Sequence, residues 1–172
     1  MNAQLFCFVM AMMSGSDGFD SLPAERIELA CEQAEHLIET VESYGIPPAV
    51  FAGLIYVESR WDPNAVSHSN ACGLTQVLPR YVDETCEELK DPETSISVGA
   101  WSLNMWTRVT VRVEGRSTRV PRPGGIQEAL ACYNVGHACS DNPRGARYAE
   151  DVLRYARQFT RRAAEVETCL EH

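Results

Sequence analysis

The chain has 172 residues, of which 45% are hydrophobic and 23% are charged, and its formal net charge is −9. A chain of this size is expected to form one domain, and its composition excludes a disordered or collagen-like protein. The acidic balance argues against nucleic acid as a partner, because phosphate binding requires a basic surface, and no apolar run is long enough to predict an integral membrane span.

The first sixteen residues form an apolar segment with two interpretations. Residues 5–13 are all hydrophobic and are followed by small residues at 14–16, which is typical of the core of a signal peptide. No Lys or Arg precedes Arg26, however, so the basic start of a signal peptide is missing. Residues 1–16 are therefore either a leader or an apolar segment packed on the domain, and residues 17–172 are expected to form a single domain.

The spacing of apolar residues predicts a mainly α-helical chain. Apolar residues recur every three or four positions over residues 22–44, which indicates an amphipathic helix. Pro47 and Pro48 open a second helix, and its residues 49–57 have no polar face, so this helix should be central to the fold. Further helices are predicted over residues 91–105, 127–133 and 146–166, with a short helical stretch at 74–78.

Residues 109–120 are predicted to form a β-hairpin. They alternate β-branched and polar residues on either side of a Glu-Gly turn. The expected fold class is therefore mainly α, with one small β-hairpin between two helices.

The seven cysteines predict disulfide bonds. Removal of a leader would remove Cys7 and leave six, an even number that suits an oxidising compartment. Cys31 and Cys169 lie on the first and last helices of residues 17–172, which favours pairing them with each other. No cysteines have CxxC spacing and the four histidines are scattered, so no metal site is predicted.

Glu58 has a position that favours acid chemistry. It lies at the end of the apolar helix, where burial and the negative end of the helix dipole both disfavour its charged form and raise its pKa. A carboxylic acid that stays protonated near neutral pH can protonate a glycosidic oxygen. A solvated glutamate at a helix end is the ordinary alternative, so the neighbouring sequence decides between them.

Four blocks of sequence resemble the catalytic domain of the soluble lytic transglycosylases, relatives of goose-type lysozyme. The blocks, in the family's order, are residues 58–67 with 71–76, 91–96 with 99–100, 129–136, and 147–148 with 152. The resemblance covers about residues 46–157. It implies a lysozyme-like α-helical domain with a glycan-binding cleft, in agreement with the helices predicted from apolar spacing.

The resemblance also implies roles for individual side chains. Glu58 matches the general acid, which becomes the general base in the second step, and Tyr133 matches a tyrosine expected to hydrogen-bond its carboxyl group. The positions matched to the saccharide cleft are Ser67, Gly73, Leu74, Gln76, Asn134 and Tyr148. Thr75 stands where the family usually has methionine, which would make this part of the cleft shorter and more polar.

The number of carboxyl groups bears on the reaction. Most glycosidases use two, whereas the resemblance supplies only Glu58. Asp62, Asp83, Glu84 and Asp91 have simpler explanations as turn, solvated or helix-capping residues. A single carboxyl group agrees with the non-hydrolytic chemistry of the family that the chain resembles. The resemblance therefore implies cleavage of the β-1,4 bond between N-acetylmuramic acid and N-acetylglucosamine, closing a 1,6-anhydro ring without a cofactor. A hydrolytic muramidase or a non-catalytic glycan-binding protein remains an alternative on the same fold.

The resemblance makes peptidoglycan glycan strands the expected partner of a monomer that acts outside the cytoplasm. The protein would work in the periplasm, after secretion, or as a phage lysin delivered to the cell wall. Cys72 and Cys132 flank Gly73 and Tyr133, so disulfides are expected to brace the cleft.

Two other groups of side chains keep alternative explanations. The arginines in and beside the hairpin either protect its strand edges or contact carboxylates of peptidoglycan stem peptides. They are Arg108, Arg112, Arg116, Arg119 and Arg122. Trp61, Trp101 and Trp106 are candidates for stacking on sugar rings, although helix packing is the simpler explanation for Trp101 and Trp106.

Overall fold

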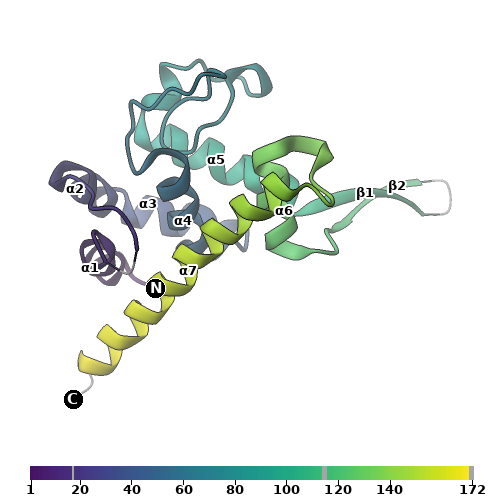
Figure 1. Ribbon diagram of the computed structural model, residues 1–172. Coiled ribbons are helices and arrows are strands. Elements are labelled where there is room, and N and C mark those ends of the chain that lie inside the picture. Colours follow the sequence, from purple (N-terminus) through teal and green to yellow (C-terminus); the bar gives the residue numbers. More distant parts are fainter. Residues whose placement is uncertain (17, 114–115, 171–172) are drawn as a thin grey trace.

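The computed structural model describes residues 1–16, 18–113 and 116–170 (Figure 1). Within these ranges the α-helices are α1 (Ala3–Met13), α2 (Ala24–Glu32), α3 (Ala34–Ser43), α4 (Pro48–Ser59), α5 (Pro92–Trp106), α6 (Gly125–Val135) and α7 (Pro143–Leu170). The strands are β1 (Arg108–Val113) and β2 (Arg116–Pro121), and three short 3-10 helices are η1 (Pro79–Tyr81), η2 (Glu88–Lys90) and η3 (Gly136–Ala138). The expected mainly α-helical fold with a small antiparallel hairpin is confirmed.

Helix α4 forms the centre of the molecule. Its residues 49–56 are all buried, as expected for a helix without a polar face. The long helix α7 crosses α4 and also packs against α6 (Figure 1). Val152, Tyr155 and Phe159 recur at helical spacing along α7 and are buried. The crossing of α4 and α7 brings the end of α4 close to the first turns of α7.

Two local predictions from the sequence were wrong. The single helix expected over residues 22–44 is broken at Gln33, where the backbone turns between α2 and α3. Apolar spacing does not detect this break because it occupies one residue. The stretch at 74–78 is a turn closed by a β-bridge between Cys72 and Val77, and Gln76 in it has a φ of 51°. A short run of apolar residues does not distinguish such a turn from a helix.

The N-terminal apolar segment forms α1, which packs against α2, α3 and α7. Phe6 is fully buried, and its ring lies 5.2 Å from that of Phe159 and 6.3 Å from that of Trp61. The hydroxyl of Tyr155 lies 3.4 Å from the sulfur of Met10. Residues 3–13 are thus part of the hydrophobic core in this structure. Among the helices of the described ranges, none has the length and apolar character needed to cross a membrane.

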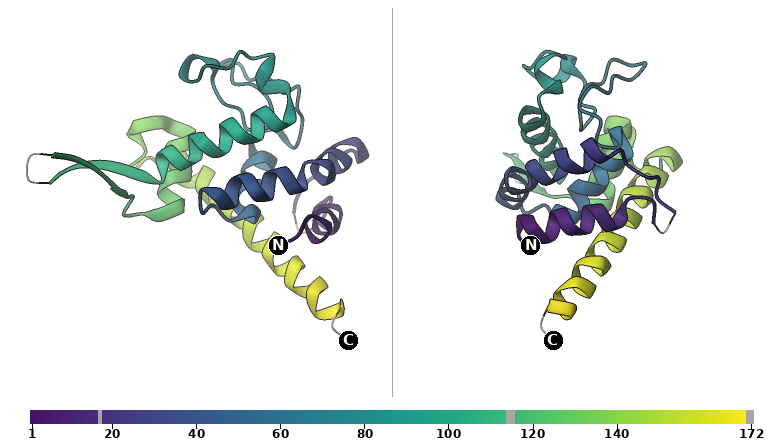
Figure 2. Two further views of the ribbon diagram at one scale, coloured as in Figure 1. Left: turned by 180° about the vertical axis from the view of Figure 1, so that it is seen from behind. Right: turned by 90° about the vertical axis from the view of Figure 1, so that its left-hand side faces the viewer.

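Three disulfides cross-link the described chain, and one expected pairing was wrong. The bonds are Cys7–Cys31, Cys72–Cys86 and Cys132–Cys139. Cys169, which was expected to pair with Cys31, is free and exposed. The physical reason is that α1 lies beside α2 and places Cys7 against Cys31, while the C-terminal end of α7 extends past its neighbours (Figures 1 and 2).

The hairpin projects from the helical body between α5 and α6 (Figure 2). In its antiparallel register, Arg108 pairs with Pro121 at the base and Val113 with Arg116 at the outer end. Arg122, just after β2, donates to the carbonyl of Trp106 over 2.6 Å, which joins the base of the hairpin to the end of α5.

Candidate active site

Glu58 lies in the last turn of α4 and is half-buried. Burial raises its pKa from the ordinary value of 4.5 to about 7, because the charged form loses hydration. Two groups oppose this rise, a hydrogen bond from Tyr148 and the positive charge of Arg144. The direction agrees with the expectation from the sequence. A carboxyl group in this state can both donate and accept a proton near neutral pH.

Tyr148, in the second turn of α7, makes the direct contact with Glu58. Its hydroxyl donates to Oε1 of Glu58 over 2.6 Å. Burial and the nearby Glu58 charge raise the pKa of Tyr148 well above its ordinary value, so the phenol stays neutral. Tyr148 therefore orients the carboxyl group and stabilises its ionised form without bringing a charge of its own.

Tyr133 does not make the hydrogen bond that was expected of it. Its hydroxyl donates to the carbonyl oxygen of Thr75 over 2.8 Å, and Tyr148 occupies the expected place beside Glu58. The Glu58 charge nevertheless raises the pKa of Tyr133, after the larger effect of burial, so the two side chains share one environment. The reason for the exchange is geometric: α6 places Tyr133 over the turn at residues 73–76, while α7 passes beside the end of α4.

This turn is held by three helices. The hydroxyl of Ser59, at the end of α4, donates to the carbonyl of Leu74 over 2.8 Å. Tyr133 of α6 donates to the carbonyl of Thr75. Ser95 of α5 accepts from the same residue twice, at Oγ from the backbone N–H over 3.2 Å and at its carbonyl oxygen from the hydroxyl over 2.9 Å. The turn next to Glu58 is therefore fixed relative to α4, α5 and α6.

Thr75 does not make the cleft more polar, contrary to expectation. The residue is fully buried, and its side chain lies against Gly99 of α5. A Cβ atom placed on Gly99 would lie 2.5 Å from Cγ2 of Thr75, so this threonine fills the space that the glycine leaves open. The side chain at position 75 thus contacts α5.

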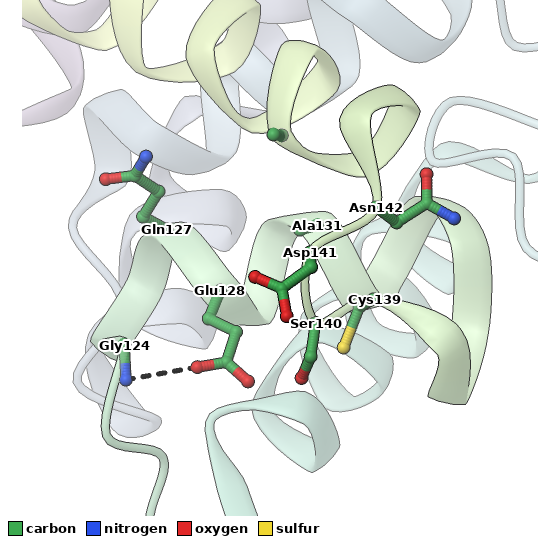
Figure 3. Close-up of a pocket in the computed structure, with 9 residues that line it drawn as sticks. Gly124, Gln127, Glu128, Ala131, Cys139, Ser140, Asp141 and Asn142 are labelled. Atoms are coloured by element: carbon green, nitrogen blue, oxygen red, sulfur yellow. Dashed lines mark hydrogen bonds between the residues drawn. The ribbon is translucent and has the colours of Figure 1, made fainter.

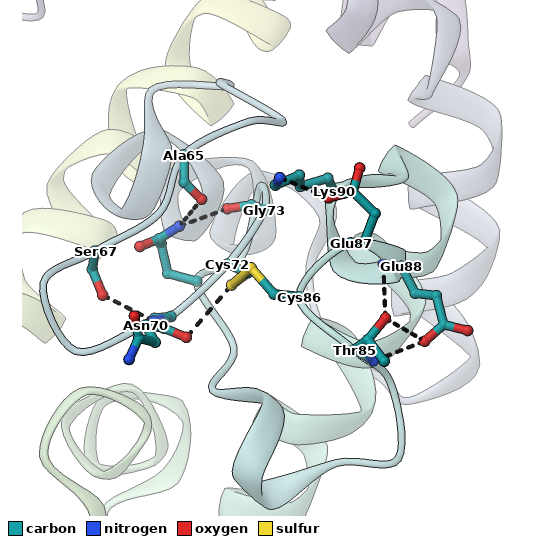
Figure 4. The surroundings of a disulfide bond; sticks show 12 residues. Ala65, Ser67, Asn70, Cys72, Gly73, Thr85, Cys86, Glu87, Glu88 and Lys90 are labelled. Carbon is teal, nitrogen blue, oxygen red and sulfur yellow. Dashed lines mark hydrogen bonds and ion pairs between the residues drawn. A yellow bond between two sulfur atoms is a disulfide. The ribbon is translucent and has the colours of Figure 1, made fainter.

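Four of the predicted cleft residues lie in one loop, drawn in Figure 4 around the Cys72–Cys86 disulfide. Ser67 accepts a hydrogen bond at Oγ from the backbone of Ala71 over 3.0 Å. The side-chain nitrogen of Gln76 donates to the carbonyls of Ala65 and Gly73 over 3.0 and 2.9 Å. These side chains hold the loop in shape, which places their backbone beside the end of α4.

Gly73 and Leu74 contribute their backbone to this loop. Gly73 has a φ of +73°, and its N–H donates to Ala65 over 3.0 Å. An added Cβ would lie 1.8 Å from the carbonyl oxygen of Leu89, so only glycine fits. The side chain of Leu74 is fully buried in the core, so the expectation that it lines the cleft is not met.

Asn134 follows Tyr133 at the end of α6 and is half-buried. Its Oδ1 atom is buried without a hydrogen-bond partner among the described residues. A buried amide oxygen without a partner costs free energy unless a ligand or water supplies a donor. Asn134 is thus a candidate for binding a ligand.

The other carboxylates have structural partners or lie elsewhere. Asp62 forms an ion pair with Arg26 at 2.7 Å, and Asp91 caps α5 by accepting from the backbone of Thr94 over 2.9 Å. Neither is among the groups that shift the pKa of Glu58. The same holds for Asp83, which is exposed, and Glu84. The geometry therefore presents one carboxyl group with acid character.

Arg144 is a site residue that the sequence analysis missed. It lies on the first turn of α7, four residues before Tyr148, and its charge lowers the pKa of Glu58. Residues four apart lie on the same face of a helix. This spacing from Tyr148 is the signal by which the sequence could have identified it.

The tryptophans do not line the site as a group. Trp61 is fully buried against Phe6, so its ring belongs to the core. Trp106 packs edge-on against His137 with ring centres 4.9 Å apart, as expected. Trp101 was expected to pack between helices, but it is 43% exposed on α5 because that helix buries its opposite face against α3 and α6.

Comparison with known protein families identifies the part of the chain that contains these residues. Residues 35–155 match the family model described as the transglycosylase SLT domain. The chain belongs to this family. The SLT match confirms the resemblance found in the sequence and, with it, the expected lysozyme-like fold class.

A curated relative of the SLT domain here is the membrane-bound lytic murein transglycosylase F of Alcanivorax borkumensis, which is 33% identical over 104 residues. The match covers 60% of this chain and 21% of the relative. The chain thus spans about a fifth of the length of that curated protein.

A hollow of about 400 Å³ in this SLT domain lies between α6 and the loop before α7 (Figure 3). Its lining includes Glu128, Asp141 and Asn142 but not Glu58. Glu128 also lies within 4.8 Å of the sulfurs of Cys132 and Cys139, a grouping that resembles a metal site. The two sulfurs form a disulfide, so neither is a thiolate that could bind a metal.

The role assigned to Tyr148 can be tested without any substrate. Tyr148→Phe removes the hydrogen bond that lowers the pKa of Glu58, so this pKa should rise above its value of about 7. The measurement is an NMR titration of the Glu58 side-chain carboxyl. Tyr155→Phe, in the buried part of the same helix, serves as the matched control and should leave the titration unchanged. Equal titrations for Tyr148→Phe and the wild type would contradict the assignment.

Proposed function

We propose that this protein is a lytic transglycosylase that cleaves the β-1,4 bond between N-acetylmuramic acid and N-acetylglucosamine in peptidoglycan. The single observation that carries the proposal is Glu58 itself, one carboxyl group with a pKa near 7, hydrogen-bonded by Tyr148 and without a second carboxylate acting on it. Membership of the SLT family supports the substrate class, as does the name of the relative.

The proposed reaction uses Glu58 twice. Its protonated carboxyl donates a proton to the glycosidic oxygen as the bond from that oxygen to C1 of N-acetylmuramic acid breaks. The carboxylate then removes the proton from the C6 hydroxyl of the same sugar while that oxygen bonds to C1. The products are a 1,6-anhydro end and a free C4 hydroxyl, and no water is consumed. Glu58 ends the cycle protonated.

The surrounding residues support this sequence of proton transfers. Glu58 is ionised between the two steps, and Tyr148 and Arg144 stabilise this ionised form. The unpartnered oxygen of Asn134 would accept a hydrogen bond from an amide or hydroxyl group of the glycan. Ser67, Gly73 and Gln76 would shape the wall of the cleft through the loop that they hold together.

We further propose that the protein acts outside the cytoplasm, where its substrate lies. The Cys72–Cys86 bond joins the loop that borders the site, and Cys132–Cys139 closes the end of α6 beside Tyr133. Structural disulfides of this kind persist in oxidising compartments.

Product mass tests the proposed reaction directly. Purified peptidoglycan is digested with the protein, and the released fragments are analysed by mass spectrometry, with the Glu58→Gln variant as the blank. We expect fragments that end in 1,6-anhydro sugars, each one water lighter than a hydrolysis product. Fragments that carry the additional water would identify a hydrolytic muramidase instead, and equal release by the blank would overturn the role of Glu58.

A further inference from the structure

The hairpin formed by β1 and β2 carries a concentrated positive charge on an acidic protein. Residues 108–122 contain five arginines and one glutamate, a formal charge of +4, so the rest of the chain carries −13 of the total of −9. The strands extend away from the helices in Figure 1 and in the left-hand view of Figure 2. A two-stranded hairpin is marginally stable by itself, so the fold gains little stability from this extension.

The register places three of the four strand arginines on one face of the hairpin. Paired residues on adjacent strands share a face, and the faces alternate along each strand. The pairs on one face are Arg108–Pro121, Thr110–Arg119 and Arg112–Ser117. We call this the basic face, because it carries Arg108, Arg112 and Arg119, all of them exposed. The opposite face carries the half-buried Val109, Val111 and Val120, and the exposed Arg116 lies on it at the outer end of the hairpin.

Two of these arginines have their charge available for a ligand. Arg108 and Arg112 form no ion pair or side-chain hydrogen bond with any residue that the structure describes. Arg119 donates to the backbone carbonyl of Met105 over 3.1 Å, which fixes the orientation of the basic face relative to α5. Arg122 lies outside this face and is neutralised by Glu128 at 2.9 Å.

Protection of strand edges does not explain this arrangement. Charges that discourage edge-to-edge pairing can lie on either face of a hairpin, and both strands here are edges. Three arginines, Arg108, Arg112 and Arg119, lie together on one face, against a single arginine at the tip of the other, and they form a surface for an anionic partner. Guanidinium groups bind carboxylates through paired hydrogen bonds, and the carboxylate is the anion that peptidoglycan offers on its peptides.

We propose that the basic face binds free carboxylates of the peptidoglycan stem peptides, at a distance from the bond that is cleaved. This inference rests on the proposed function and names a second point of contact with the same substrate. Arg108 and Arg112 are separated by about 13 Å along β1, so each would contact a different carboxylate. Exposed charge pairs contribute modest affinity each, so the basic face would strengthen the binding of glycan that carries peptides without affecting catalysis.

The test compares two substrates that differ only in their peptides. One is soluble glycan with intact stem peptides, and the other is the same glycan after an amidase has removed them. In the double variant Arg108→Gln/Arg112→Gln, we expect KM for the peptide-bearing glycan to rise about fivefold with kcat unchanged. Kinetics on the stripped glycan should equal those of the wild type.

Two further variants make the comparison specific. Arg157→Gln/Arg161→Gln removes the same charge from two exposed positions on α7 and should leave both substrates unaffected. Arg108→Lys/Arg112→Lys keeps the charge but loses the paired hydrogen bonds, and should retain only part of the affinity for peptide-bearing glycan. An equal rise in KM on both substrates, no rise on either, or the same rise in the α7 variant would overturn the proposal.

A binding measurement separates this proposal from the proposed function. Co-sedimentation of the Glu58→Gln protein with intact and with amidase-treated sacculi reports contact without turnover. If the wild-type protein cleaved neither glycan, the proposed function would fail. Stronger sedimentation with intact sacculi, lost when Arg108 and Arg112 are replaced by glutamine, would still support the basic face, and its absence would refute it.

Discussion

Glu58→Gln should lower the turnover of peptidoglycan roughly a thousandfold or more, because an amide can neither donate the first proton nor accept the second. The substitution preserves the size of the side chain, and the Tyr148 hydroxyl can still donate to the amide oxygen. Turnover is measured as the rate of release of soluble fragments. Glu39→Gln, at an exposed position on α3, is the control and should retain full activity.

Glu58→Gln lowers activity, but it should raise the stability of the folded protein above neutral pH. In the folded protein the pKa of Glu58 is about 7, against 4.5 for an unperturbed glutamate. Between these values the folded state holds a proton that the unfolded state has lost, so the free energy of unfolding falls as pH rises from about 4.5 to 7. Glutamine does not titrate and avoids this loss. We therefore compare the free energy of unfolding of Glu58→Gln with that of the wild type. This difference should favour the variant by up to about 3 kcal/mol more at pH 8 than at pH 4.

Urea unfolding of both proteins at the two pH values measures this gain. A difference in unfolding free energy between wild type and Glu58→Gln that does not change with pH would contradict the raised pKa. Activity that survives in the variant would contradict the mechanism separately. The two results together separate burial of the carboxyl group from its use as an acid.

The second large effect is expected for Gly73→Ala. The new methyl group would lie 1.8 Å from the carbonyl oxygen of Leu89, and the residue would have to keep a φ of +73°. Backbone strain and overpacking together should cost about 3 kcal/mol or more. The melting temperature should fall by roughly 10 °C for a chain of this length. Thermal unfolding followed by circular dichroism provides the measurement.

Gly45→Ala isolates the steric part of this prediction. Gly45 has a nearly identical φ of +70°, but an added Cβ would have no atom within 4 Å. Its alanine variant should therefore lose only about 1 kcal/mol, the cost of the left-handed backbone. If Gly45→Ala and Gly73→Ala were equally destabilised, the close approach to Leu89 would not be the cause.

Patterns that repeat along the chain were the part of the fold that could be predicted. The helices α4 to α7 and the hairpin follow from apolar spacing, proline positions and alternating residues, all of which are local. The raised pKa of Glu58 also follows from a local pattern, because a helix without a polar face must be buried. A break of one residue at Gln33 leaves the periodicity intact, so the division into α2 and α3 could not be predicted.

Contacts between distant segments account for the remaining differences. Two tyrosines matched the family's site, and only the crossing of α7 with α4 determines that Tyr148 contacts Glu58 while Tyr133 binds the Thr75 backbone. Cys7 pairs with Cys31 because α1 packs beside α2, and no spacing rule contains that information. The direction of a side chain within a turn is equally inaccessible to sequence patterns.

The fit between Thr75 and Gly99 has a consequence for how the active-site loop can be exchanged between related domains. A larger side chain at position 75 would collide with α5. A larger side chain at position 99 would displace Thr75, whose carbonyl accepts the hydrogen bond from Tyr133. A chimaera that receives this loop alone would contain Thr75 without the glycine at position 99 that makes room for it. Positions 75 and 99 should therefore be transplanted together with the loop.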